Sequence, residues 1–318
     1  MVVLRKTRIV CVSDTHGYTP SEAGFKLPAG DVLIHAGDLT NQGGKSELER
    51  TLQWIQNADY EVKIVVAGNH DLTLDHSFRA RCGSDLRSPP RENPEECIEL
   101  VKKMDPSIVY LQHSSYMIKL SSPEGPKTMF KVFGSPYSRF RGQWAFGYNT
   151  PEEGAHLWSQ IPDDVDIVVA HTPPKGIRDE NLDNSPESKA FGCEEFLQAL
   201  SRVRPLLTVC GHVHQGRGCE RIQWANSVDG TLVAGRREEP LPPVGSKKQS
   251  LVDLTGRRQA ALHNVSHCQL QGSTELMRRE TCVVNAAIMG SNWPHRGGRK
   301  FHRPIVVDVN LPAWDTGP

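Results

Sequence analysis

The chain has 318 residues, of which 37% are hydrophobic and 7% aromatic, and its 37 basic residues balance 37 acidic ones. A neutral chain offers no broad electrostatic footprint for long nucleic acid or for an anionic membrane, so a small substrate held in a local site is expected. No run approaches the ~18 apolar residues that a membrane span needs, and residues 1–8 lack the apolar region of a secretory signal, so we expect a soluble, cytoplasmic protein.

The first predicted strand ends in two side chains of metal-ligand type. Residues 8–12 (RIVCV) form an apolar run, and Asp14 and His16 follow it closely. If the chain stays extended beyond the strand, the period of two places both side chains on the same side, where they reach one ion. A D-x-H triplet is a weak signal by itself, so its meaning depends on the rest of the chain.

A second apolar run, residues 32–36 (VLIHA), leads through Gly37 to Asp38. His35 lies inside this run, so we expect a buried, hydrogen-bonded core histidine there rather than a ligand. Asp38, in contrast, comes directly after the strand. It therefore repeats the arrangement of Asp14 at the end of the first strand.

A helix is expected between the second and third strands. Ser46 and Glu49 have the spacing of a capping box, and apolar residues follow at helical spacing up to about residue 57. A helix that connects two parallel strands is the usual crossover of an α/β fold. The order strand, strand, helix, strand therefore favours a parallel sheet.

The third strand carries the densest group of polar residues. Residues 63–71 (KIVVAGNHD) begin as an apolar, β-branched run, which Gly68 breaks. Asn69, His70 and Asp71 are thereby delivered together at the carboxyl end of the strand. Ligands and catalytic groups of open α/β sheets lie at such an end.

The following region mixes loop, helix and short strands. Residues 72–93 are polar and loop-like, and Asn93 with Pro94 is typical of the start of a second helix. Turn residues separate the next three apolar runs, which favours an antiparallel portion of sheet. These strands are expected at residues 108–111, 116–120 and 129–133.

A glycine-bearing loop at residues 138–149 (SRFRGQWAFGYN) concentrates basic and aromatic side chains, among them Arg139, Arg141, Trp144 and Phe146. A surface loop with an aromatic anchor and a wall that faces the substrate are two readings that the residues support equally. Trp144 and Phe146 offer a stacking surface for a base in the second reading.

Two further helices enclose a buried strand. Thr150, Pro151 and Glu153 are typical of a capped helix that reaches about residue 161, and a second helix is expected at residues 193–204. The strand between them, DIVVA, is followed at once by His171. Proline residues then prevent the strand from continuing.

The last polar strand end resembles the first. Residues 206–210 (LLTVC) form an apolar run, and His212 and His214 follow it two residues apart. The same period-two argument that joins Asp14 and His16 therefore places these two imidazoles on one side.

The character of the chain changes at residues 226–279, where polar residues and proline dominate and no sustained period survives. We expect an extended loop or a partly disordered insertion that is dispensable for folding. His263 and His267 lie within it, four residues apart, and are expected to belong to a solvated loop rather than to a metal site. Residues 281–287 and 305–309 are then expected to be closing strands of a second sheet.

The whole chain, residues 1–318, is expected to form a single domain with this insertion. Disulfides are not expected, because the cysteines lack C-x-x-C spacing and several lie inside apolar runs. The eight cysteines are Cys11, Cys82, Cys97, Cys193, Cys210, Cys219, Cys268 and Cys282.

Five separate strand ends therefore deliver polar side chains of metal-ligand type. A chance alignment of all five is hard to credit. Carboxylate, imidazole and amide oxygen together suit a borderline divalent ion such as manganese, iron or zinc, and the number of ligands suffices for two ions if one carboxylate bridges. The set comprises Asp14, His16, Asp38, Asn69, His70, His171, His212 and His214.

The order D-x-H, G-D, G-N-H-D, a lone His and G-H-x-H resembles the calcineurin-like metallophosphoesterase superfamily. The match covers nearly all of the chain outside residues 226–279. Within the superfamily, the chain looks most like the metallophosphoesterase-domain proteins related to the brain-expressed vertebrate members. The segments that carry this closer resemblance are GDVLIHAGDLT, VVAGNHDLTLD, VFGSPYSRF, HTPPKGIRD and CGHVHQGRG.

The resemblance implies a four-layer α/β/β/α sandwich with a two-metal site between its loops. It implies two divalent or mixed-valence ions, of manganese, iron or zinc, bridged by Asp38. One ion would be held by Asp14, His16, Asp38 and His214, and the other by Asp38, Asn69, His171 and His212.

The resemblance also implies roles for the two residues beside Asn69. His70 would act as general acid or as a hydrogen-bond donor to the transition state, and Asp71 would orient its ring. Two ions with a shared hydroxide, whose pKa falls from 15.7 toward ~7, would account for hydrolysis of a phosphate ester at neutral pH.

The leading functional hypothesis is a metal-dependent phosphoesterase, specifically a phosphodiesterase that hydrolyses small nucleotide-like substrates. A phosphomonoesterase or protein phosphatase of the same superfamily is the first alternative. A nucleotide-binding or scaffolding protein with negligible turnover is the second. The neutral charge argues against nucleases that track long DNA.

Overall fold

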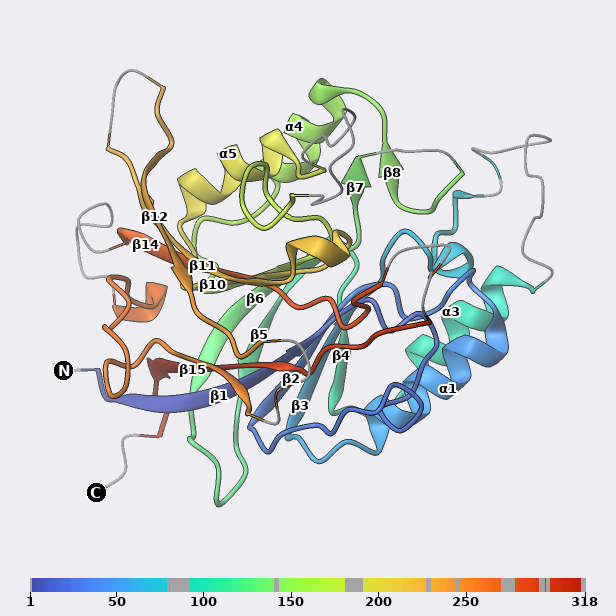
Figure 1. Cartoon of the computed structure of the whole chain (residues 1–318), viewed down its shortest axis with the longest axis horizontal. Coiled ribbons are helices and arrows are strands. Elements are labelled where there is room, and N and C mark those ends of the chain that lie inside the picture. The colour runs from blue at the N-terminus through green and yellow to red at the C-terminus, as the bar shows by residue number, and fades with distance from the viewer. Residues whose placement is uncertain are drawn as a thin grey trace.

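The computed structural model describes residues 2–78, 80, 92–139, 143–180, 191–226, 230–243, 246, 248–269, 278–291, 295 and 298–315. Two β-sheets lie face to face, and helices cover the outer face of each (Figure 1). This arrangement confirms the mixed α/β fold that the sequence predicts and the four layers that the family resemblance implies. Within the described residues, no helix combines the length and the apolar character that a membrane crossing requires.

The first sheet has six strands, and its central strands are parallel. β1, β2, β3 and β4 run in one direction, and β15 joins β1 antiparallel. The carboxyl ends of β1, β2 and β3 therefore share one edge of the sheet. The strand order is β13 (Ser250–Asp253), β15 (Ile305–Pro312), β1 (Leu4–Val12), β2 (Val32–Ala36), β3 (Val62–Val66) and β4 (Ile108–Tyr110).

The second sheet has seven strands around a parallel centre formed by β6, β9, β10 and β14. A separate two-stranded sheet joins β7 (Ser138–Arg139) to β8 (Gly147–Tyr148). The seven-stranded order is β12 (Val233–Glu239), β11 (Gly218–Trp224), β14 (Glu280–Asn285), β10 (Leu207–Cys210), β9 (Ile167–Ala170), β6 (Met129–Ser135) and β5 (Ser114–Lys119).

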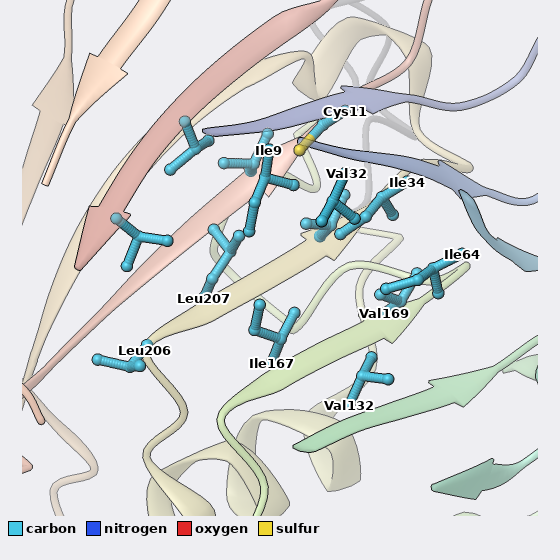
Figure 2. Close-up of a cluster of buried hydrophobic side chains, with 14 of the residues drawn as sticks. Ile9, Cys11, Val32, Ile34, Ile64, Val132, Ile167, Val169, Leu206 and Leu207 are labelled. Carbon is cyan, nitrogen blue, oxygen red and sulfur yellow. The ribbon is translucent and has the colours of Figure 1, made fainter. Parts of the chain in front are cut away.

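The inner faces of the two sheets form the central core (Figure 2). Ile9, Ile34 and Ile64 from the first sheet point toward Ile167 and Leu207 from the second, and each of these side chains is fully buried. Each such side chain contributes roughly 1.5–3 kcal/mol when it leaves water. The relative position of the two sheets is therefore determined by this apolar layer.

The helices complete the outer layers. α1 (Lys45–Gln56) and α3 (Pro94–Lys102) cover the first sheet, and α4 (Pro151–Ser159) and α5 (Glu194–Val203) cover the second. Short 3₁₀ turns lie at η1 (Leu72–Leu74), η3 (His214–Gly216) and η4 (His267–Gln269).

The helix starts test the predicted capping signals. Thr150 and Glu153 form the expected capping box of α4, and Asn93 caps α3 as expected. The capping box expected at Ser46 is wrong, because α1 begins at Lys45 and its N-cap is Gly44, which has no side chain to accept a bond.

Two strand assignments, those of β4 and β15, differ from the expectations. β4 belongs to the first sheet and pairs parallel with β3, whereas β5 and β6 form the expected antiparallel pair. β15 pairs with β1 and so closes the first sheet, while β14 lies in the second. Short runs are assigned to a sheet by partners far away in the sequence, which local turn signals do not reveal.

The segment at residues 226–279 is not the loop that its composition suggests. β12 pairs with β11 at an edge of the second sheet, and β13 pairs with β15 at an edge of the first. β12 escaped prediction because it lies at a sheet edge and exposes four of its seven residues. β13 is mostly buried, but it is only four residues long and therefore shows no clear period. Residues 227–229, 244–245, 247 and 270–277 of the segment lie outside the described residues.

The described end of this segment is anchored in the core. Arg278 is 4% exposed, and its guanidinium donates to the carbonyl oxygens of Val165 (3.1 Å) and Val203 (3.0 Å) and to Asp166 Oδ1 (3.2 Å). Asp166 also accepts a bond from Ser266 Oγ (2.8 Å). These contacts bind the segment to the second sheet.

Candidate metal centre

The strand ends of both sheets meet at one place. Asp14 and His16 follow β1, Asp38 follows β2 and Asn69 follows β3, all from the first sheet. The second sheet supplies His171 after β9, and His212 and His214 after β10. A parallel bridge between Ser13 and Ala287 joins the two sheets beside these loops. The structure thus brings together all seven residues predicted as ligands.

One group of ligand atoms gathers around His16. Its Nε2 atom lies 3.2 Å from Nε2 of His214 and 3.8 Å from Oδ2 of Asp38. His214 Nε2 lies 3.4 Å from Oδ1 of Asp14. Two imidazole nitrogens and two carboxylates therefore converge on a common point.

A second group gathers around Asn69. Its Oδ1 atom lies 2.9 Å from Nε2 of His171 and 2.7 Å from Nδ1 of His212. His171 Nε2 also lies 3.3 Å from Oδ1 of Asp38. Asp38 thus presents Oδ2 to the group around His16 and Oδ1 to the group around Asn69, which is the geometry that a bridging carboxylate requires.

The backbone at these positions is held in an unfavourable conformation. Asp14 (φ 56°), His16 (φ 46°), Asp38 (φ 54°) and His212 (φ 65°) all lie in the left-handed region, which non-glycine residues rarely adopt. Each such residue costs about 1–3 kcal/mol, and such strain clusters at functional sites. The residues are also buried, between 0% and 7% exposed for the first three.

Two glycines allow the ligand loops to approach each other. A Cβ at Gly68 would collide with Oδ1 of Asp38, and a Cβ at Gly211 would collide with Oδ2 of Asp14. Only glycine therefore fits beside either carboxylate, which explains the G-N-H-D and G-H-x-H patterns physically.

The electrostatics of the site suit a cation. Burial lowers the pKa of His16 and of His212 to about 3, so both rings are neutral near pH 7 and keep a lone pair for a ligand bond. Burial opposes protonation of His171 as well, but the adjacent Asp38 carboxylate raises the pKa of His171 to about 9. The negative charge of the Asp38 carboxylate therefore stabilises a positive charge placed beside it.

The donor set fits divalent metal ions. Three groups of side chains hold their ligand atoms within 4.8 Å of one another: Asp14, His16 and His214; His16, Asp38 and His70; and Asp14, Asp38 and His171. The ring orientation of His171 is determined by its Nδ1 atom, which donates to the carbonyl oxygen of Ala36 (2.9 Å). Such a bond from the second ring nitrogen is typical of metal-binding histidines.

His70 lies beside these groups, but the expected contact with Asp71 does not hold its ring. Its Nδ1 atom donates to the carbonyl oxygen of Asn41 (2.6 Å), and its ring packs against Trp144 with centroids 4.0 Å apart and ring planes tilted by 34°. Its backbone N–H donates to Oδ1 of Asp38 (2.9 Å). The sequence could not predict the contact with Asn41, because the backbone carbonyl of Asn41 makes it and not its side chain.

Asp71 does not orient the His70 ring, contrary to the expectation. Its carboxylate accepts bonds from the backbone N–H groups of Thr40 (2.8 Å), Leu39 (3.1 Å) and Gly68 (2.7 Å). Burial raises the pKa of Asp71 to about 6. Asp71 therefore joins the loop after β2, which carries Asp38, to the loop after β3, which carries Asn69.

His35 is the buried core histidine that the sequence predicts. It is 0% exposed, and its Nε2 atom lies 2.9 Å from the hydroxyl of Thr15. Burial lowers the pKa of His35 to about 4. The ring therefore stabilises the loop that carries Asp14 and His16 through its contact with Thr15.

A cavity of about 920 Å³ opens over the site. His16, Asp38 and His70 form its floor, and Arg139 and Trp144 line it from the loop at residues 138–149. Both residues therefore face this cavity, as the second of the two interpretations of the loop requires, and contact with a substrate stays a prediction. Phe146 instead is 1% exposed and belongs to the core, and Arg141 lies outside the described residues.

Comparison with known proteins identifies the fold family. Residues 7–216 match the family model described as calcineurin-like phosphoesterase, which covers about two thirds of the chain. A human protein named metallophosphoesterase domain-containing protein 1 is 36% identical over 75% of this chain and 70% of its own length, and its mouse counterpart matches equally. These matches confirm the resemblance predicted from the motifs.

Another relative is much longer than the shared region. A protein from Emericella nidulans named probable rhamnogalacturonate lyase C is 39% identical over 68% of this chain, but the match covers only 18% of that protein. Among solved structures, a phosphopantetheinyl hydrolase from Mycobacterium tuberculosis is 17% identical, covers 74% of this chain and 89% of its own, and has a TM-score of 0.40.

Proposed function

The chain belongs to the calcineurin-like phosphoesterase family, and from this premise we propose that it is a metal-dependent phosphoesterase with a dinuclear centre. The observation that carries the proposal is Asp38, whose two carboxylate oxygens face two separate groups of ligand atoms. Two ions of manganese, iron or zinc are the cofactors that this donor set suits. When bound, such ions activate water and neutralise the charge on the phosphoryl group.

The ligand assignment follows from the two groups. Asp14, His16 and His214 would hold the first ion together with Asp38. Asn69, His171 and His212 would hold the second, again with Asp38. The neutral rings of His16 and His212 need lose no proton before they bind.

His70 is proposed to act on the leaving group. Because Nδ1 donates to the Asn41 carbonyl, Nε2 is the nitrogen that remains for the substrate. The neutral ring accepts a hydrogen bond at Nε2, and the protonated ring donates one to the departing oxygen. Trp144 supports the ring by packing against it.

The proposed substrate is a small, nucleotide-like phosphodiester. A cavity of about 920 Å³ is of the size that encloses a small organic molecule. Trp144 adds an aromatic wall beside His70, on which a base can stack. A long nucleic acid would instead need an extended basic surface, and the chain has no net positive charge.

The test is a substrate screen on purified protein of known metal content. Metals are determined by elemental analysis, and phosphomonoesters are compared with linear and cyclic phosphodiesters at equal metal loading. Preferred hydrolysis of diesters supports the proposal. Preferred hydrolysis of monoesters would favour a phosphomonoesterase, and nucleotide binding without hydrolysis of any ester would favour a binding protein.

A further inference from the structure

A hairpin beyond the region matched by the family model forms one wall of the cavity. It follows β14, and its two arms are residues 288–291 and 298–302. Gly290 N–H donates to the Lys300 carbonyl and His302 N–H donates to the Ile288 carbonyl, both at 2.7 Å. The family model ends at residue 216, so this wall belongs to a part of the chain that it does not cover.

The hairpin arms are tied to the loops that carry the ligands. Ile288 N–H donates to the carbonyl oxygen of Ser13 (2.8 Å), the residue before Asp14. Asn285, at the end of β14, donates through Nδ2 to the carbonyl oxygen of Val213 (2.8 Å), between His212 and His214. The position of the hairpin is therefore coupled to the position of the candidate metal centre.

Arg299 is the charged side chain that this hairpin adds to the cavity wall. Its guanidinium lies 5.3 Å from the ring centroid of Tyr18, and Phe301 packs on the same ring with centroids 5.2 Å apart. Tyr18 is itself only two residues from His16, and Arg299, Tyr18 and His16 all line the cavity. A cation placed over an aromatic ring is held in a limited range of positions.

Arg299 is exposed, and among the described residues no carboxylate lies within 4.0 Å of its guanidinium, which lies over the Tyr18 ring. Arg50, which lines the same cavity, lies 3.8 Å from the Glu22 carboxylate. Arg299 therefore differs from Arg50 in having no carboxylate partner among the residues that the structure describes. A guanidinium of this kind binds phosphate or carboxylate through two parallel hydrogen bonds.

We propose that Arg299, supported by Tyr18, binds a second negatively charged group of the substrate, remote from the phosphate ester that is cleaved. This inference rests on the proposed function, because it assumes that the cleaved ester occupies the centre around Asp38. The group is a phosphate or a carboxylate, and the substrate class is accordingly a phosphoester that carries an additional anion.

The experiment uses three p-nitrophenyl phosphodiesters that share one leaving group. Their second ester arms are ethyl, 2-carboxyethyl and 2-phosphoethyl, which are neutral, carboxylate and phosphate probes. The metal-loaded full chain is compared with Arg299→Gln, Arg299→Lys and the control Lys300→Gln. Lys300 carries the same charge on the same hairpin, but it does not line the cavity.

Arg299→Gln is expected to raise KM for at least one charged ester by about tenfold, with KM for the ethyl ester and kcat for all three unchanged. Arg299→Lys should recover part of the loss, and Lys300→Gln should behave as the parent. The charged arm that responds identifies the anion. Equal effects on neutral and charged esters, or an equal effect of Lys300→Gln, would overturn the proposal.

A binding measurement separates this inference from the proposed function. The same three esters are titrated into each variant by calorimetry, so affinity is determined even if no ester is hydrolysed. Absence of hydrolysis with charge-selective binding that depends on Arg299 would reject the proposed function alone. Hydrolysis of the ethyl ester without any Arg299-dependent charge selectivity would reject the second anion site alone.

Discussion

Asp38 concentrates the chemistry of the site in one side chain. It is 2% exposed, it lies in the left-handed region, and its two oxygens face different ligand groups. Burial would raise the pKa of Asp38, but the nearby His171 lowers it well below its usual value. Asp38 therefore stays negatively charged between the group of ligand atoms around His16 and the group around Asn69.

We predict that Asp38→Asn removes both ions and abolishes hydrolysis while the fold persists. The amide keeps the size of the side chain but loses the charge that offsets two neighbouring dications. Metal stoichiometry by elemental analysis and activity are the measurements. His171→Ala and His212→Ala serve as controls, because each should weaken mainly one ion. Retention of two ions and near-normal turnover in Asp38→Asn would refute the bridging role.

A second residue-scale prediction concerns His70→Ala. The variant should keep its metal content, because His70 is proposed to act on the substrate and not as a ligand. Turnover of alkyl esters should fall by about 10²–10⁴-fold, the usual contribution of general acid catalysis, and activated aryl esters should be affected far less. An equal loss on both kinds of ester would remove His70 from the leaving-group role.

At the scale of elements, the strands of residues 226–279 extend both sheets. β12 adds to β11, β13 adds to β15, and Arg278 joins the end of the segment to Asp166 in the core. The expectation that this segment is dispensable for folding conflicts with these contacts. Its removal would expose two new sheet edges and leave Asp166 without its buried guanidinium partner.

Arg278→Met is therefore predicted to lower the free energy of unfolding by about 3–5 kcal/mol, the usual cost of removing one partner of a buried ion pair. Denaturant unfolding followed by circular dichroism measures the change. Arg279→Met, at an exposed neighbouring position, is the matched control and should change stability by less than about 0.5 kcal/mol. Similar stability of the two variants would show that the segment contributes little to folding.

At the scale of the whole molecule, the site lies where two sheets meet. The first sheet supplies Asp14, His16, Asp38 and Asn69, and the second supplies the three remaining histidines. A cation bound by ligands from both sheets would connect the two sheets, and it could do so only in the folded protein. Metal binding and stability should therefore be linked, since the unfolded chain does not hold these ligands together.

Chelation is accordingly predicted to lower the melting temperature by several degrees. At a free metal concentration 100 times Kd, binding adds about 2.7 kcal/mol to the free energy of unfolding, and that amount is lost when the metal is removed. Differential scanning calorimetry with and without chelator measures the shift, and added manganese should restore it. Asp38→Asn should show little shift, because it is expected to hold little metal. A chelator-independent melting temperature in the parent protein would contradict the linkage.

The sequence predicts most of this site, because its signals are local. Parallel strands leave the residues after them at a common edge, so Asp14, Asp38, Asn69, His171 and His212 can be recognised from apolar runs that end in polar residues. The buried state of His35 follows from its place inside such a run in the same way. The apolar runs of the sequence therefore predicted an α/β fold with polar residues at its strand ends. The family resemblance carried by the same motifs implied the four-layer fold class and the assignment of ligands to two ions.

Only the tertiary structure decided how these parts act on one another. The carbonyl of Asn41 holds His70, Asp71 joins two loops, and Arg299 reaches the cavity from a distant hairpin. Every residue has a backbone carbonyl, so the sequence does not indicate which carbonyl will bind His70. An edge strand such as β12 buries too few side chains to show the alternation of apolar and polar residues that identifies a strand. Contacts between residues hundreds of positions apart depend on how two sheets pack, and that packing is a property of the assembled core rather than of any local pattern.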